Sequence, residues 1–205
     1  MDKMHYYQTI ETGAQAEYKD RGSRFIAYTY PLKNTDEFKK IIAAVKKEHP
    51  KANHHCFAYR LGTDGTQFRA SDAGEPSGTA GRPILGQIDS RNVTDILIVV
   101  VRYFGGTLLG VPGLINAYKT AAALALQVTP VVRKPILDKF NLQFDYTQLN
   151  PVMTIVKQFD CSVLKQDVQL FCSLDIGIPK NRVTEAMHRL GDIANIAIKP
   201  LEEIK

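Results

Sequence analysis

The spacing of hydrophobic residues changes several times along the first half of the chain, and each change marks an expected element. Hydrophobic and polar positions alternate over residues 23–30 and 53–61, as on half-buried strands. Between them, residues 38–45 carry apolar side chains three and four positions apart, which predicts an amphipathic helix. The six apolar residues at 96–101 lack a polar face and predict a central strand buried on both sides. Residues 113–127 then predict a final, alanine-rich helix.

The last third of the chain follows a pattern of its own. Alternation at 140–146, helical spacing at 149–156 and the periodicities that follow predict the order β-α-β-β-α-β, which is a ferredoxin-like arrangement. Two prolines within residues 129–135 cannot continue the preceding helix, so this stretch is the expected boundary. The sequence therefore predicts an α+β protein of two domains, with residues 1–130 as the first, 131–138 as a linker and 139–205 as the second.

Composition indicates where such a protein works and what it binds. The 205 residues include three cysteines without a C-x-x-C pair, as in a reduced cytoplasmic protein. The start of the chain lacks a secretory-type apolar core, and the longest apolar run is far short of the ~20 residues that span a bilayer. The whole net charge of +5 falls in residues 1–138. This asymmetry favours an anionic partner for the first domain, although a solvated lysine-rich helix face also accounts for it.

Two glycine-rich segments flank the apolar strand, with DAGEPSGTAG at 72–81 and RYFGGTLLG at 102–110. Glycine is used where the backbone approaches something closely or takes a positive φ, so the segments predict a bound group or another protein's backbone. Gly105 and Gly110 have the spacing of a phosphate loop, but Val111-Pro112 replaces the required lysine and hydroxyl residue. Nucleotide hydrolysis of that type is excluded. Binding of phosphate or another anion by backbone N–H groups stays open, beside a simple tight connection.

The first glycine segment leads into an expected helix at 79–88, with Ser77 or Thr79 as its cap and free N–H donors at its start. Arg102 is the most informative charge, because it ends a buried strand. There it must pair with a carboxylate, such as Asp72 or Glu75, or meet an anionic ligand.

The motif His54-His55-Cys56 lies on an expected strand, where the first and third side chains face one way and the second faces the other. Three adjacent residues rarely form a metal site, and no second ligand cluster is visible in the sequence. We therefore expect no metal and no cofactor. One of the histidines is expected to point toward Arg60, Arg69 or Arg102.

These segments, together with Ser23-Arg24-Phe25 and HHCFAYR at 54–60, resemble the signature of the Impact family in its bacterial, two-domain, YigZ-like branch. The resemblance covers about residues 15–128, whereas 139–205 match only by pattern. It implies a first domain like the second domain of a small-subunit ribosomal protein. For the second domain it implies a ferredoxin-like fold similar to the C-terminal domain of elongation factor G.

The resemblance also implies a function. Eukaryotic members regulate translation by competing for the activator of a kinase that phosphorylates an initiation factor, a pathway that bacteria lack. We expect a non-enzymatic cytoplasmic regulator linked to translation or the stress response, which binds RNA, the ribosome or a translation-related protein. The site is expected in a basic cleft of the first domain formed by eleven residues: Arg24, His54, Arg60, Asp72, Glu75, Ser77, Gly78, Thr79, Arg102, Gly105 and Gly106.

An enzyme is the alternative interpretation of the same cleft, as a hydrolase or transferase acting on a small phosphorylated or peptide-like substrate. Ser77 or Cys56 would be the nucleophile, a histidine the base, and the Gly105-Gly106 amides an oxyanion site. Asp72 and Glu75 could instead serve as acid and base. The family resemblance supplies no catalytic residues. A purely structural scaffold is the third interpretation, and it leaves both glycine loops unexplained.

Overall fold

The computed structural model describes residues 5–201. The chain divides into two compact units, residues 7–134 and residues from 135 onward, with residues 5 and 6 grouped with the latter. The division falls inside the predicted linker. In the part of the chain that is described, no helix has the length and apolar character needed to cross a membrane.

The first domain is built on a five-stranded antiparallel sheet. Its strands follow the spatial order β2 (Gln15–Asp20), β3 (Ser23–Pro31), β6 (Ile96–Tyr103), β4 (His54–Leu61) and β5 (Gln67–Ser71). The central strand is β6, and residues 96–101 are fully buried. This confirms the prediction of a strand buried on both faces, which follows from its lack of any polar face.

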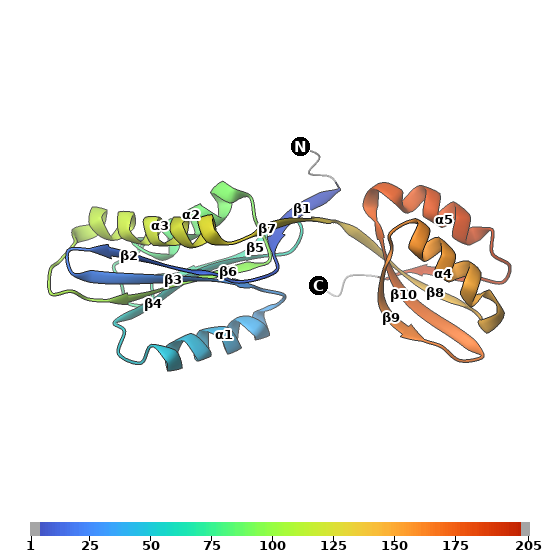
Figure 1. Ribbon diagram of the computed structural model, residues 1–205, viewed down its shortest axis with the longest axis horizontal. Helices are drawn as coiled ribbons and strands as arrows, with labels where there is room; N and C mark the ends of the chain where they lie inside the picture. Colours follow the sequence, from blue (N-terminus) through green and yellow to red (C-terminus); the bar gives the residue numbers. More distant parts are fainter. Residues whose placement is uncertain (1–4, 202–205) are drawn as a thin grey trace. The chain divides into compact units, whose positions relative to one another are not determined.

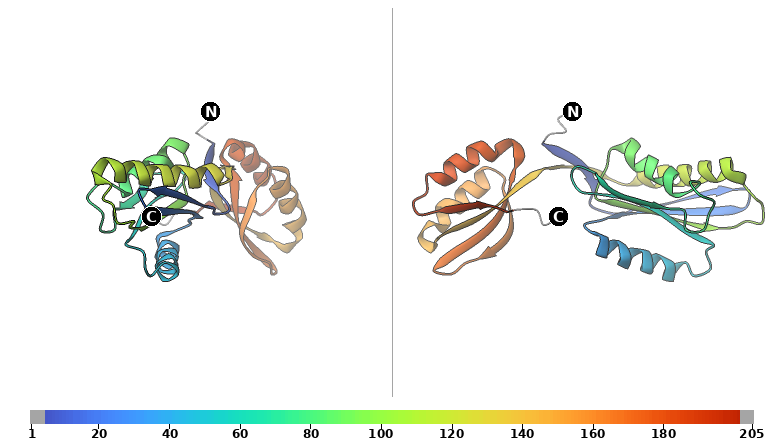
Figure 2. Two further views of the ribbon diagram at one scale, coloured as in Figure 1. Left: turned by 60° about the vertical axis from the view of Figure 1, so that its left-hand side comes forward. Right: turned by 180° about the vertical axis from the view of Figure 1, so that it is seen from behind.

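Helices cover both faces of this sheet, as Figures 1 and 2 show. Helix α1 (Thr35–Glu48) lies on one face, and α2 (Gly81–Arg91) and α3 (Gly110–Val128) lie on the other. Asn34 caps α1, because its side chain accepts hydrogen bonds from two backbone N–H groups of the first turn. Helix α3 begins three residues earlier than predicted and holds Pro112 in its first turn, where the missing N–H costs little.

The segment after α3 is extended rather than looped. Strand β7 (Val131–Pro135) pairs with β1 (Tyr6–Ile10) in a separate two-stranded sheet, and β8 (Leu137–Asp145) follows almost at once. The two prolines of the boundary stretch, Pro130 and Pro135, thus precede and end β7, which is where proline is tolerated.

The second domain has the predicted order: β8, α4 (Leu149–Gln158), β9 (Ser162–Asp167), β10 (Phe171–Pro179), α5 (Val183–Gly191) and β11 (Ala197–Pro200). Its sheet has the antiparallel order β11-β8-β10-β9. Apolar side chains alternate along β8 and β10 and pack in one core with α4 and α5. The ferredoxin-like α+β prediction is confirmed. Short 3₁₀ turns, Tyr146–Gln148 and Lys180–Arg182, precede the two helices.

Candidate functional site

Strand register brings the ends of three strands together under the two glycine segments. Arg102, near the end of β6, lies opposite His54 of β4 on one side and Phe25 of β3 on the other. Because directly opposed residues of antiparallel strands share a face, these three side chains point to the side of the sheet that α2 and α3 cover. One of the two histidines is expected to point toward an arginine of the site, and the structure places His54 beside Arg102.

Glu75 completes a buried network around Arg102. Its Oε1 lies 2.6 Å from Arg102 Nη1 and accepts a 2.8 Å hydrogen bond from the Tyr118 hydroxyl. The side chains of Arg102 and Glu75 are only 6% and 3% exposed. Of the two alternatives predicted for Arg102, a carboxylate or an anionic ligand, the structure shows the carboxylate, and Glu75 is the partner. A buried charge left alone would be costly, so each charge keeps the other in place.

The rest of the Arg102 guanidinium is enclosed by aromatic rings. Its centre lies 5.4 Å from the Phe25 ring and 5.6 Å from the Phe104 ring. Its Nη2 makes a long 3.4 Å contact with Ser23 Oγ, and its Nε finds no partner within residues 5–201. Arg102 thus serves as an internal anchor below Phe104 and is enclosed rather than presented to a phosphate group.

Asp72 occupies the start of α2. Its two carboxylate oxygens accept hydrogen bonds of 2.8–2.9 Å from the backbone N–H groups of Gly78, Ala80 and Gly81. Capping by Ser77 or Thr79 is therefore a wrong prediction, because a carboxylate from eight residues earlier reaches the same donors. Those N–H groups are not available to an external anion, and the carboxylate also balances the positive end of the helix dipole.

The pH dependence of stability tests this cap. Burial raises the pKa of Asp72, but hydrogen bonds from the three N–H groups outweigh it and hold the pKa below the ordinary 3.8. A lowered carboxyl pKa contributes stability that is present above pH ~4 and is lost as pH falls through the folded-state value. We expect Asp72→Asn to cost about 1–2 kcal/mol at pH 7 and to remove this part of the acid dependence. Urea unfolding of both proteins between pH 3 and pH 7 measures it, and a cost that is equal at both ends contradicts the cap.

The candidate nucleophiles and bases do not meet. His54 Nδ1–H donates to the Ala73 carbonyl at 3.0 Å, and its Nε2 is 3.8 Å from Glu75 Oε1, beyond hydrogen-bond length. His55 is on the opposite face, as predicted, and contacts the His49 carbonyl. Ser77 is exposed and makes no hydrogen bond to a histidine within the described chain.

Cys56 is also unsuited to nucleophilic chemistry. It is fully buried, 2.9 Å from the Asp72 carbonyl oxygen and 3.3 Å from the Tyr118 hydroxyl. Burial raises the pKa of its thiol to about 12, so the reactive thiolate is scarce at neutral pH. These contacts instead join β4 to the residue that follows β5 and to α3.

Two of the predicted site arginines lie elsewhere. Arg24 points to the α1 face and pairs with Glu17 at 2.7 Å. The side chain of Arg60 points to the same face of the sheet as that of His54. Arg60 lies six residues along β4 from His54, however, which is about 20 Å at about 3.3 Å per residue. It forms an ion pair with Asp89 at 2.6 Å. These positions contradict a single basic cleft that includes both arginines.

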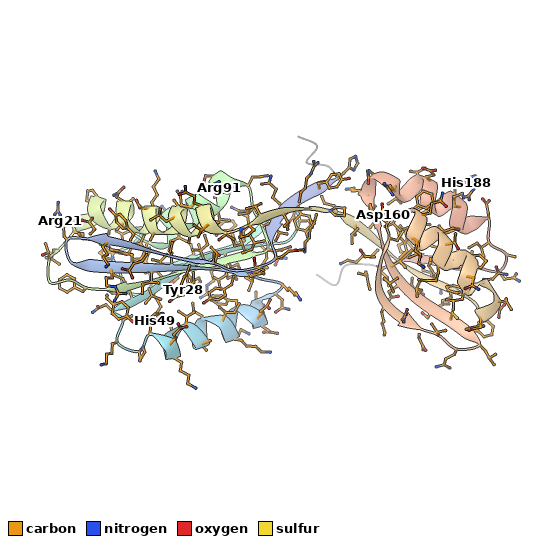
Figure 3. All side chains as sticks on the ribbon, in the orientation of Figure 1. Arg21, Tyr28, His49, Arg91, Asp160 and His188 are labelled. Atoms are coloured by element: carbon orange, nitrogen blue, oxygen red, sulfur yellow. The ribbon has the colours of Figure 1, made fainter. Side chains whose placement is uncertain are left out.

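The second glycine loop is fixed to the sheet at its start. The N–H of Phe104 donates to Asn53 Oδ1 at 2.8 Å, and the N–H of Gly105 donates to Ser23 Oγ at 3.2 Å. Gly105 packs directly against Gly22 in the turn between β2 and β3. Arg21, labelled in Figure 3, marks this end of the first domain.

Comparison with known proteins decides the family. The model of the Impact N-terminal domain matches residues 21–126. The Escherichia coli (strain K12) IMPACT family member YigZ is 37% identical over 181 residues, which cover 87% of this chain and 89% of YigZ. The chain belongs to the IMPACT family.

Two further relatives match this chain over very different lengths. A crystal structure described as that of a hypothetical protein is 34% identical in sequence and superposes with a TM-score of 0.77. The match covers 98% of this chain and 99% of the chain in that crystal structure. Protein IMPACT of Rattus norvegicus is 34% identical over 94 residues, which cover 44% of this chain and 30% of the rat protein. The two-domain architecture is thus shared with solved and bacterial relatives along almost the whole chain.

Sequence reasoning missed three residues that build the site of this Impact domain. Tyr118 lies within the alanine-rich helix, and Ser23 and Asn53 each start or precede a strand. One signal was present for Tyr118, since a large side chain with a hydroxyl group in a helix of small residues needs both space and a buried partner. Nothing in the sequence identifies which polar group receives the loop N–H groups.

The Impact domain also has a cavity of about 500 Å³ near the start of β6, at the opposite end of that strand from the site. None of the eleven predicted site residues contributes to its wall, which is formed by Tyr7, Thr9, Ile10, Glu11, Pro31, Leu32, Lys33, Asp95 and Lys134.

Proposed function

We propose that this protein is a non-enzymatic, cytoplasmic regulator linked to translation that acts by binding a macromolecular partner. The partner would contact the end of the first domain where residues 73–79 and 104–110 lie. Membership of the IMPACT family supports the link to translation, because eukaryotic members are translation regulators. RNA, the ribosome and a translation-related protein are all partners of this general kind.

One observation carries the binding role, namely that the charges of the site are used internally. Glu75 pairs with Arg102, and Asp72 accepts hydrogen bonds from the start of α2. Among the described residues, His54 has no candidate nucleophile within hydrogen-bond distance. Such a network positions the loops above it without offering a reactive pair. Within residues 5–201, no contact favours the hydrolase or transferase alternative.

A reconstituted bacterial translation system tests this proposal. We expect the purified protein to change the rate of reporter synthesis and to sediment with ribosomes or translation factors at low salt. The double variant Ser77→Trp/Thr107→Trp should lose both effects, because it places a large side chain on each loop at an exposed position and leaves the buried network intact.

Lys40→Trp, exposed on α1, is the matched control and should behave like the native protein. Repeating the sedimentation after nuclease treatment and across a salt series separates the partners, since electrostatic binding to nucleic acid weakens steeply with salt. Unchanged translation together with no sedimentation at low salt would overturn the proposal.

A further inference from the structure

Four large apolar side chains lie exposed beside the site, within only twelve residues. Leu108 is 82% exposed, Val111 52%, Phe104 45% and Ile115 38%. We refer to these four residues as the apolar rim. They come from the loop after β6 and from the first turns of α3. Single exposed apolar residues are ordinary, but a cluster on one edge of a domain marks an interaction surface.

The fold does not require these side chains to be apolar. Leu109 and Leu114 of the same segment are buried and pack against the core of the first domain. Val111 and Ile115 are four residues apart and therefore share the outward stripe of α3. The segment thus divides its apolar residues between a face that stabilises the domain and a face that points to solvent.

The charges around the apolar rim are mainly positive. The exposed charged residues of 73–82 and 104–119 are Arg82 and Lys119, because Glu75 is buried in its pair. Lys119 continues the stripe of Ile115, and Arg82 is close enough to Asp72 to lower the pKa of that carboxyl group. The neighbouring β2–β3 turn adds Arg21 next to the acidic Asp20.

The buried network holds the start of the apolar rim, at Phe104, in place. One face of Phe104 lies over Arg102, and the backbone of the loop is bonded to Asn53 and Ser23. A surface that is already ordered before binding loses little conformational entropy when a partner docks. The rim therefore has the two features of a protein-binding patch: apolar anchors and a fixed backbone.

We propose that the apolar rim binds a protein segment with apolar side chains flanked by Asp or Glu. This inference rests on the proposed function and specifies the partner class at the same site. RNA fits less well, because three of the four rim residues are aliphatic and offer no ring on which a base could stack. The aliphatic side chains would enter apolar contacts, and Arg82 and Lys119 would face the acidic flanks.

Selection from a phage-displayed library of random twelve-residue peptides tests the proposal with the full chain as target. We expect enriched peptides to combine Leu, Ile or Phe with Asp or Glu. A synthetic copy of the best peptide should bind at least about tenfold more weakly to Leu108→Ser/Val111→Ser. Replacing the acidic residues of the peptide with Asn and Gln should weaken its binding to the native chain in low salt.

Leu170→Ser is the matched control, because Leu170 of the second domain is 86% exposed and lies outside the apolar rim. It should bind the peptide as the native chain does, and circular dichroism checks that all variants fold. Absence of enrichment, enrichment of basic peptides, or equal binding by the double variant would overturn the inference. So would rim-dependent binding of a labelled oligouridylate without any peptide. The translation assay reports on the proposed function separately.

Discussion

Replacing Glu75 with alanine is expected to lower the free energy of unfolding of the first domain by about 3–5 kcal/mol. The change leaves the Arg102 guanidinium buried without its carboxylate and removes the acceptor of the Tyr118 hydroxyl. An uncompensated buried charge is among the most costly defects in a protein interior, which sets this variant apart from an ordinary loss of one contact.

Hydrogen exchange of the β6 amides, followed by mass spectrometry, measures this effect in the domain concerned. Glu17→Ala is the control, because Glu17 also pairs with an arginine, at 2.7 Å, but at an exposed position. Exposed pairs contribute little, so this variant should exchange almost as slowly as the native chain. Equal effects of the two variants would show that burial of the Arg102–Glu75 pair has no energetic importance.

The combination Glu75→Gln/Arg102→Met separates charge from packing. Removing both charges leaves no unpaired ion, so the double variant should be more stable than Glu75→Ala. It should also be more stable than the sum of the stability losses of Glu75→Gln and Arg102→Met, each measured alone, would predict. A strictly additive result would mean that the two side chains stabilise the domain independently.

Periodicity predicted the fold well because most elements have one consistent apolar spacing that changes where the next element begins. The continuous apolar run at 96–101 has a single consistent place, the centre of a sheet covered on both faces. Along β8 and β10, regular alternation determined which side chains meet α4 and α5. The ends of elements were harder, as at α3, because the three additional residues of its first turn, Gly110 to Pro112, are exposed and therefore add nothing to the apolar repeat.

Within the site, strand alternation could predict only which neighbouring side chains share a face of one strand. That rule correctly placed His54 and Cys56 on one face of β4 and His55 on the other, but it could not show that Arg102 lies opposite His54, because this depends on the strand register. It could not place Arg24 or Arg60 outside the site, because their ion pairs depend on which strand or helix lies beside them. Nor could it show that Asp72 reaches forward to cap α2, since this needs the three-dimensional path of the loop.

The glycine at position 105 is expected to be irreplaceable, even by alanine. A Cβ atom there would overlap the backbone of Gly22 and the amide nitrogen of Ser23, where no flexible side chain can move aside. We expect Gly105→Ala to cost about 3 kcal/mol or more, at the upper end for overpacking, because the turn between β2 and β3 must shift. Thermal unfolding followed by circular dichroism measures the loss.

Two neighbouring substitutions separate this clash from other consequences of losing glycine. Gly106 has open space around it but a φ of +86°, so Gly106→Ala should cost only the backbone strain, about 1–2 kcal/mol. Gly86 lies in α2, where an added Cβ atom would meet no atom outside the adjacent helix backbone within 4 Å, and Gly86→Ala should stabilise the helix by about 0.5–1 kcal/mol. A clash at Gly105 therefore predicts the order of stability Gly86→Ala, native, Gly106→Ala, Gly105→Ala. If Gly105→Ala proved as stable as Gly106→Ala, the loop would not be held against the turn, and the apolar rim would lose the rigid support from which its binding role is inferred.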